Sequence, residues 1–169
     1  MKNLNKLKII LFLAIAAFLT SCNKDDDNGG IPATGSYINA KIGGATFTTV
    51  SNGVASGTKV GTGSNTEIMI LGTNNNLDAF SISLSGISAP GTYAINPETD
   101  SVLDFYDSNS DETYDTSFCD SGSGTITVTS LTSTQIEGTF SFIGKYIGDC
   151  TGTGKNITEG RFRIIFLQL

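Results

Sequence analysis

Apolar residues that alternate with polar ones are the feature that most constrains the fold of this chain. The pattern is clearest in segments 125–129, 136–142 and 160–166. Successive side chains of a β-strand point to opposite faces, so a period of two residues gives one buried and one exposed face. The three segments predict an antiparallel meander, with 131–134 as its first turn and the Gly-rich stretch 144–156 as its second connection.

Shorter segments upstream carry the same kind of signal. Gly43 and Gly44 can form a two-residue hairpin turn between two strands. The apolar run 68–71 predicts a buried strand, and 51–66 gives no strong element. The further strands that we expect are 37–42, 45–50, 80–84, 91–95 and 102–106. No sustained helical period occurs outside the N-terminus, so we predict an all-β antiparallel β-sandwich or flattened barrel of about eight or nine strands.

The N-terminus has the pattern of an export signal. Lys2, Lys6 and Lys8 precede an unbroken run of 11 apolar residues from Ile9 to Leu19. A membrane-spanning helix needs about 20 apolar residues, so this run is too short to span and has the length of a signal-peptide core. We expect an N-terminal signal helix over residues 1–21.

The tetrapeptide Leu19-Thr20-Ser21-Cys22 resembles the lipobox of bacterial lipoproteins. This resemblance implies cleavage before Cys22, a diacylated Cys22 thiol and an acylated new amine, with palmitate among the chains. An ordinary signal peptide followed by a chance cysteine is the alternative. The expected organisation is a signal peptide over 1–21, a lipidated flexible tether over 22–35 and a β-sandwich domain over 36–169.

A charged run follows the cysteine at once. Lys24, Asp25, Asp26 and Asp27 resemble the surface-export tag of Bacteroidetes-type lipoproteins. The resemblance implies a protein anchored in the outer membrane through its N-terminal lipid and displayed at the cell surface. The alternative is a solvated charge run on a tether.

The strand segments also resemble a family as a whole. The sequences YINAKIGGATF, APGTYAI and GTITVTSLTSTQIEGTFSF…ITEGRFRI, together with the lipobox, are similar to small Bacteroidetes-type lipoproteins that carry a domain of unknown function. The shared motifs are turn glycines and core aromatic residues. The resemblance implies a β-sandwich lipoprotein and provides no catalytic residue.

Composition excludes several classes of function. Once residues 1–21 are removed, seven basic residues face sixteen acidic ones, a net charge of −9 that disfavours nucleic-acid binding. The chain has no histidine, which removes Ser-His-Asp and Cys-His catalysis and histidine-based metal sites. With no P-loop either, we expect no cofactor and no enzymatic activity, although a pair of carboxylates could in principle serve a glycosidase.

Two cysteines remain besides Cys22. Cys119 and Cys150 lie in Gly- and Ser-rich connections next to strands of the meander. Connections that leave the same end of a sheet can approach one another, and an exported protein is outside the reducing cytoplasm. We predict a Cys119–Cys150 disulfide, with two separate thiols as the alternative.

Half of the acidic residues fall in segment 98–120, which contains no basic residue. Asp107-Ser108-Asn109-Ser110-Asp111 matches the opening of a calcium loop, but Glu112 and Phe118 stand where such a loop needs Gly and a bidentate Glu. The candidate ligands are therefore Asp107, Asn109, Asp111 and Asp115. A solvated acidic loop without metal is the alternative that we favour.

These features predict a non-catalytic binding or structural module, anchored by lipid and displayed at the surface. The alternative is an accessory carbohydrate-binding lipoprotein of nutrient capture. The chain has no Trp, and the tyrosines that could stack on a sugar instead are Tyr37, Tyr93, Tyr106, Tyr114 and Tyr146. The composition is compatible with a glycan or a protein as the partner and does not distinguish between them.

Overall fold

The computed structural model describes residues 32–168, which form an all-β domain. Its strands are β1 (Tyr37–Ile42), β2 (Ala45–Thr48), β3 (Val54–Val60), β4 (Glu67–Thr73), β5 (Ala79–Ser85), β6 (Gly91–Ile95), β7 (Val102–Asp107), β8 (Glu112–Asp115), β9 (Ser123–Leu131), β10 (Gln135–Tyr146) and β11 (Lys155–Ile165). A 3-10 turn, Gly63–Asn65, connects β3 to β4.

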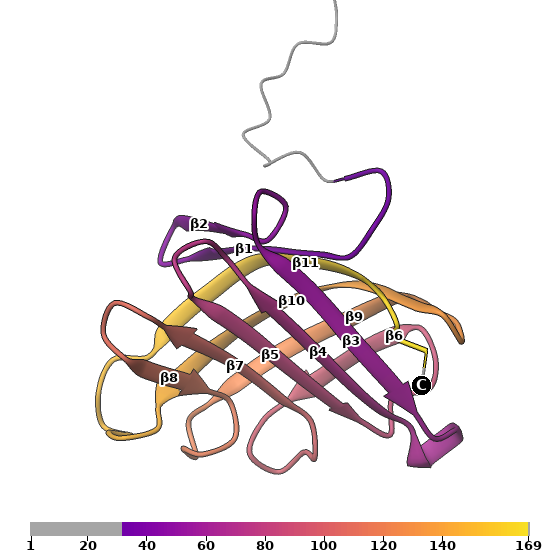
Figure 1. Ribbon diagram of the computed structural model, residues 1–169. Helices are drawn as coiled ribbons and strands as arrows, with labels where there is room; N and C mark the ends of the chain where they lie inside the picture. The colour runs from indigo at the N-terminus through magenta and orange to yellow at the C-terminus, as the bar shows by residue number, and fades with distance from the viewer. Residues whose placement is uncertain (1–31, 169) are drawn as a thin grey trace, which may run out of the picture.

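The strands form a curled antiparallel sheet (Figure 1). One layer has the order β2-β1-β11-β10-β9-β6, and the other has the order β3-β4-β5-β7-β8. The long strand β10 joins them, because residues 136–143 pair with β9 whereas Lys145 and Tyr146 pair with β8. A path of nine strands therefore curls into a half-barrel. The predicted all-β class, as a flattened antiparallel barrel, is confirmed.

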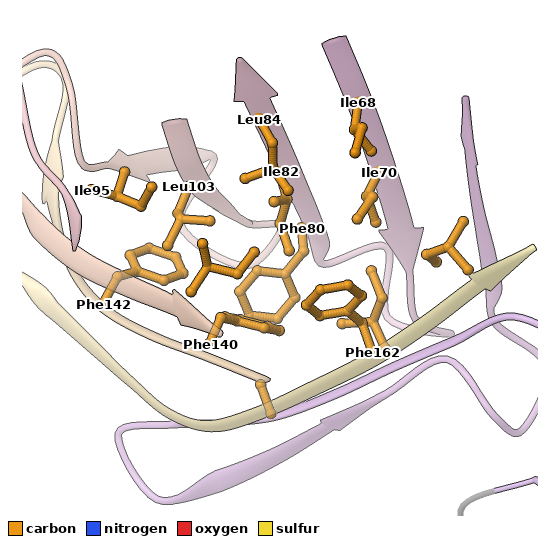
Figure 2. Close-up of a cluster of buried hydrophobic side chains, with 14 of the residues drawn as sticks. Ile68, Ile70, Phe80, Ile82, Leu84, Ile95, Leu103, Phe140, Phe142 and Phe162 are labelled. Atoms are coloured by element: carbon orange, nitrogen blue, oxygen red, sulfur yellow. The ribbon is translucent and has the colours of Figure 1, made fainter. Parts of the chain in front are cut away.

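Aromatic rings fill the space between the two layers (Figure 2). Phe80 on β5 lies at the centre, with ring centroids 4.7 Å from Phe47, 5.1 Å from Phe105 and 5.4 Å from Phe140. Aromatic pairs at such separations stabilise a core beyond the burial of their area, by about 0.5–1.5 kcal/mol each. The rings come from both layers, so the same contacts hold the half-barrel curled.

The predicted meander is present as β9, β10 and β11, and it forms the longest strands of the domain. β3 and β8 were not predicted. β3 interrupts its alternation with Gly57, where an added Cβ would lie 2.6 Å from the carbonyl oxygen of Met69 and 2.8 Å from Ile164 Cγ2. β8 has the sequence Glu-Thr-Tyr-Asp, whose acidic residues favour a loop by composition.

One burial prediction is wrong in part. The apolar run 68–71 is a strand, but only Ile68 and Ile70 face the core, while Met69 and Leu71 are exposed. The reason is that only one face of β4 is covered by the opposite layer, and the strand's period of two residues takes alternate side chains to solvent.

The expected signal helix over residues 1–21 lies outside the described residues. Within 32–168, the structure has no helix that is long and apolar enough to span a bilayer.

Candidate binding cavity

A cavity of about 330 Å³ lies at one end of the half-barrel. Four segments that are distant in the sequence surround it: the β1–β2 hairpin, the β4–β5 turn, the β7–β8 hairpin and the start of β11. Its lining residues are Ile42, Ala45, Thr46, Phe47, Asn74, Asn76, Asp78, Phe105, Asp107, Asn109 and Lys155. Other hollows lie on the outer face of β9–β11 and beside the loop 118–123.

The floor of this cavity is apolar and its rim is polar. Phe47 and Phe105 at the floor are almost fully buried, because they are also part of the aromatic core. Binding pockets for small molecules commonly combine an apolar wall with a few fixed polar groups in this way.

The β4–β5 turn is fixed by its own side chains. Asn74 Oδ1 accepts hydrogen bonds from the backbone N–H groups of Asn76 (2.9 Å) and Asp78 (3.0 Å). Asn74 Nδ2 donates to Asp78 Oδ2 at 3.0 Å. Leu77 adopts a left-handed conformation, with φ of 69°, which tightens the turn. The amide of Asn74 and the carboxylate of Asp78 are thus held in place before any ligand binds.

Ser108 connects this turn to the β7–β8 hairpin. Its backbone N–H and hydroxyl lie 3.1 Å and 2.7 Å from Asp78 Oδ1, and the hydroxyl also lies 2.6 Å from the carbonyl oxygen of Asn76. Both sides of the rim are therefore joined through Asp78, which makes the cavity mouth a connected polar network.

Lys155, at the start of β11, supplies the cation of the rim. Its ammonium group pairs with Asp107 and lies 4.9 Å from the ring centroid of Tyr114. The hydrogen bond from Lys155 lowers the pKa of Asp107, and the backbone N–H of Asn109 adds to this. Asp107 is therefore held as a carboxylate. The Tyr114 hydroxyl donates to Glu112 at 2.5 Å, which raises the pKa of Tyr114 to about 12.

The structure does not bring the four candidate calcium ligands together. Asp107 pairs with Lys155, Asp111 accepts a hydrogen bond from the Tyr106 hydroxyl, and Asp115 accepts those of the Ser117 and Phe118 backbone. Asp111 and Asp115 lie at opposite ends of β8, and four residues of strand span about 13 Å. Between residues 32 and 168, no group of three or more His, Cys, Asp or Glu side chains could hold a metal ion.

A different carboxylate pair lies on the outer face of the half-barrel. Asp104 on β7 is directly opposite Asp115 on β8 and Ser81 on β5. Partial burial, followed by repulsion from Asp115, raises the pKa of Asp104 from 3.8 to about 6. The neighbouring Lys145 is directed to the carbonyl oxygen of Gly152 at 3.0 Å. This pair faces away from the cavity, since Leu103 and Phe105 on either side of Asp104 point into the core.

The predicted disulfide is confirmed. Cys119 and Cys150 are bonded, with their Cα atoms 5.5 Å apart. The bond ties the connection between β8 and β9 to the connection between β10 and β11. Both connections lie at the same end of the meander, because Ser123 at the start of β9 pairs with Ile143 near the end of β10.

The predicted lipidation site, the export tag and the tyrosines lie outside the described residues or away from the cavity. Cys22, Lys24, Asp25, Asp26 and Asp27 lie outside the described residues. None of the five tyrosines, all of which lie within residues 32–168, lines the cavity. Tyr37 and Tyr114 are buried, the Tyr93 hydroxyl donates to the Ala89 carbonyl oxygen, and that of Tyr106 donates to Asp111.

Most of the cavity was not predicted from the sequence. Asn74, Asn76, Asp78 and Lys155 were not recognised as site residues. The run Asn74-Asn75-Asn76 between two strands was the available signal, because asparagines in such a position mark a turn that can organise polar side chains. Nothing in the sequence links that turn to Lys155.

Fold and cavity together define a class: a small disulfide-bonded antiparallel half-barrel with a polar cavity at one end. Residues 34–165 match the model of a family described as a domain of unknown function (DUF6252), and the chain belongs to that family. The resemblance to a family carrying such a label is thereby confirmed. No curated protein and no solved structure matches the chain.

Proposed function

We propose that this protein is a non-catalytic binding module, anchored by lipid at Cys22 and displayed at the cell surface, whose ligand occupies the cavity at the end of the half-barrel. The observation that carries this proposal is the rim of that cavity. Asn74, Asp78, Asp107 and Lys155 are fixed by mutual hydrogen bonds above an apolar floor. Side chains that are already ordered lose little conformational entropy when a ligand binds.

The chemistry of the rim supports binding without catalysis. A general acid needs a proton to give near neutral pH, and the lowered pKa of Asp107 leaves it ionised. Asp104, whose pKa is raised to about 6, lies on the outer face and does not line the cavity. The chain also lacks histidine, the most frequent acid-base residue.

A carbohydrate is the ligand class that the lining favours, which makes an accessory carbohydrate-binding lipoprotein the second candidate. The rim combines amide donors and acceptors of Asn74, Asn76 and Asn109 with a hydroxyl group of Thr46. Two carboxylates disfavour an anionic ligand, while one ammonium group offsets part of the attraction for a cation. A neutral molecule with several hydroxyl groups and an apolar face matches such a lining.

The cavity is tested by titrating neutral mono- and oligosaccharides into the full-length protein in detergent, with calorimetry as the readout. The Asn76 side chain makes no hydrogen bond within residues 32–168, so Asn76→Ala removes a ligand contact with little effect on the fold. We expect that variant to weaken binding about tenfold, as the loss of one hydrogen bond of about 1–1.5 kcal/mol implies. Asn75→Ala is the matched control, because Asn75 is exposed but does not line the cavity. Equal losses in both variants contradict this assignment.

The anchor and the export tag are tested separately. We expect Cys22→Ala to leave an unacylated precursor, which intact-mass spectrometry detects. Replacing Lys24, Asp25, Asp26 and Asp27 with Ala should leave the acyl chains in place but abolish surface display. Added protease then no longer degrades the protein on intact cells, whereas unchanged degradation rules out the tag.

A further inference from the structure

We propose that the half-barrel rests on the lipid surface through an exposed apolar patch next to its tether, so that the cavity opens away from the membrane. This inference rests on the proposed acylation of Cys22. The tether-side patch consists of Val60, Met69, Leu71, Ile165 and Leu167. Each of these side chains is at least 45% exposed.

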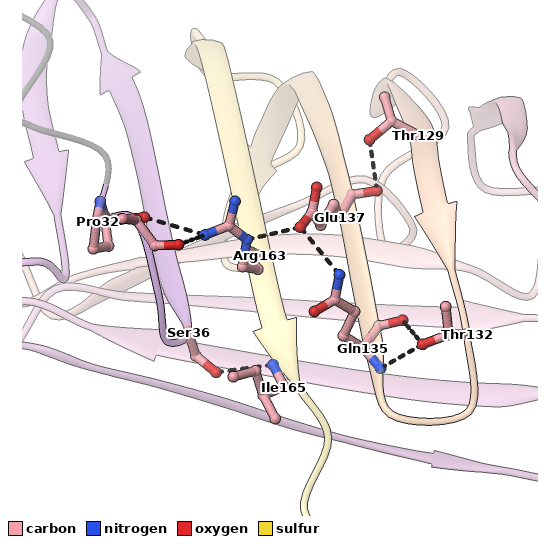
Figure 3. Close-up of polar contacts among 9 residues, drawn as sticks. Pro32, Ser36, Thr129, Thr132, Gln135, Glu137, Arg163 and Ile165 are labelled. Carbon is pink, nitrogen blue, oxygen red and sulfur yellow. Dashed lines mark hydrogen bonds and ion pairs between the residues drawn. The ribbon is translucent and has the colours of Figure 1, made fainter.

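The first described residues are fixed against the end of β11 (Figure 3). Arg163 Nη1 donates to the carbonyl oxygens of Pro32 (3.1 Å) and Ala33 (3.2 Å). The backbone N–H of Ile165 donates to Ser36 Oγ at 3.0 Å. The path toward Cys22 therefore leaves the domain at a defined point, beside Arg163 and two residues before Ile165.

The patch continues from this point across the open edge of the other layer. The backbone N–H of Leu167 donates to the carbonyl oxygen of Gly57 on β3 at 2.9 Å. On β4, the strand that pairs with β3, Met69 and Leu71 lie on the outer face. Exposed apolar side chains that gather in one region of a surface commonly mark a contact with a membrane or a partner.

The length of the tether selects the membrane as the occupant. Nine residues, 23–31, lie between the lipidated cysteine and Pro32. The ten Cα-to-Cα steps from Cys22 to Pro32 cover about 33 Å at full extension. Acyl chains buried in the bilayer thus keep the tether-side patch within reach of the lipid surface, whatever path the tether takes.

The cavity lies at the far end of the same strand. β11 runs from Lys155 at the cavity to Ile165 at the tether, and its eleven residues span about 33 Å. The cavity end also holds the acidic β7–β8 hairpin, with Asp107, Asp111 and Glu112. Anionic headgroups repel such an end, which favours the same orientation.

The absence of tryptophan from the chain allows a direct test. A single tryptophan is introduced into the full-length acylated protein, which is reconstituted in vesicles of phosphatidylcholine and phosphatidylglycerol that contain brominated acyl chains. Leu167→Trp and Met69→Trp report on the tether-side patch, and Asn75→Trp reports on the cavity end. All three positions are exposed, so each substitution is compatible with the fold. We expect a blue-shifted emission and quenching by the brominated lipids for the first two reporters and neither effect for Asn75→Trp.

Equal quenching of all three reporters, no quenching of any of them, or quenching of Asn75→Trp alone overturns the orientation. The mass of each protein is measured in the same samples. An acylated protein whose patch reporters stay unquenched disproves the docking while the anchor stands. A wild-type protein without acyl chains on Cys22 disproves the anchor itself, and the docking with it.

Discussion

Replacing Asp104 by asparagine should stabilise the domain at neutral pH. The carboxylate of Asp104 is partly buried on the outer face of β7 and lies opposite that of Asp115. Within residues 32–168 no cation pairs with it, and the neighbouring Lys145 is directed to the carbonyl oxygen of Gly152. Asp104→Asn keeps the shape of the side chain and its hydrogen bonding to Ser81 while removing the charge.

The magnitude follows from the pKa of Asp104, which rises from 3.8 to about 6 on folding. A difference of about two pKa units corresponds to about 3 kcal/mol. Because part of the carboxylate is exposed and screened by solvent, we expect a gain of about 1–3 kcal/mol at pH 7. The raised pKa means that the folded state binds this proton more tightly, so the contribution of Asp104 to the free energy of unfolding should increase as pH falls from 7 to 4.

Urea denaturation of the wild type and the variant between pH 4 and pH 8 measures this effect. The two curves should converge as pH falls from 7 toward 4, because Asp104 then becomes protonated in the folded state and, close to its ordinary pKa of 3.8, increasingly in the unfolded state as well. Asp100→Asn, an exposed carboxylate before β7, controls for net charge. An Asp104→Asn variant no more stable at pH 7 than Asp100→Asn would refute the reasoning.

Three further predictions concern the fold and its metal response. The disulfide closes a separation of 31 residues, so replacing Cys119 and Cys150 by serine should cost about 3.7 kcal/mol, or roughly 10–15 °C in Tm; a calorimetric Tm that stays unchanged contradicts this. Phe80→Ala removes the ring at the centre of the aromatic cluster and should cost about 3–5 kcal/mol in urea unfolding, whereas Phe118→Ala at an exposed ring should cost far less. Calcium at matched ionic strength should not raise Tm; a rise of several degrees that is abolished by Asp111→Ala would overturn the dispersed arrangement of the acidic residues.

The strands that the sequence predicted are those with an uninterrupted period of two. In β10, Ile136, Phe140 and Phe142 are buried, as the alternation requires. The period of two failed to predict a strand where a residue is required by a contact with another strand rather than by its own strand. Gly57 in β3 leaves room for Ile164 of another strand, a contact that local sequence does not encode. Tyr114 in β8 packs inward among acidic residues whose composition indicates a loop.

The disulfide was predictable because, once Cys22 is assigned to acylation, only Cys119 and Cys150 remain to pair, and the meander places their connections at the same end of the sheet. The calcium ligands show the limit of such reasoning. The spacing of residues within a segment does not determine where the next strand begins or what each side chain contacts. Here β8 begins directly after Asp111 and ends at Asp115, so the two carboxylates are held apart.

By itself, the sequence determined the all-β class, the meander and the disulfide, because each depends on a local period or a count of residues. The export signal at the N-terminus stays a prediction from a short motif. Only the tertiary structure decided the curl of the sheet, the raised pKa of Asp104 and the cavity. Lys155 and Asp107 are 48 residues apart in the chain, and Asp78 and Ser108 are 30 apart. Such contacts depend on which strands pair and how strongly the sheet twists, and these are collective properties of the packed core rather than of any single segment.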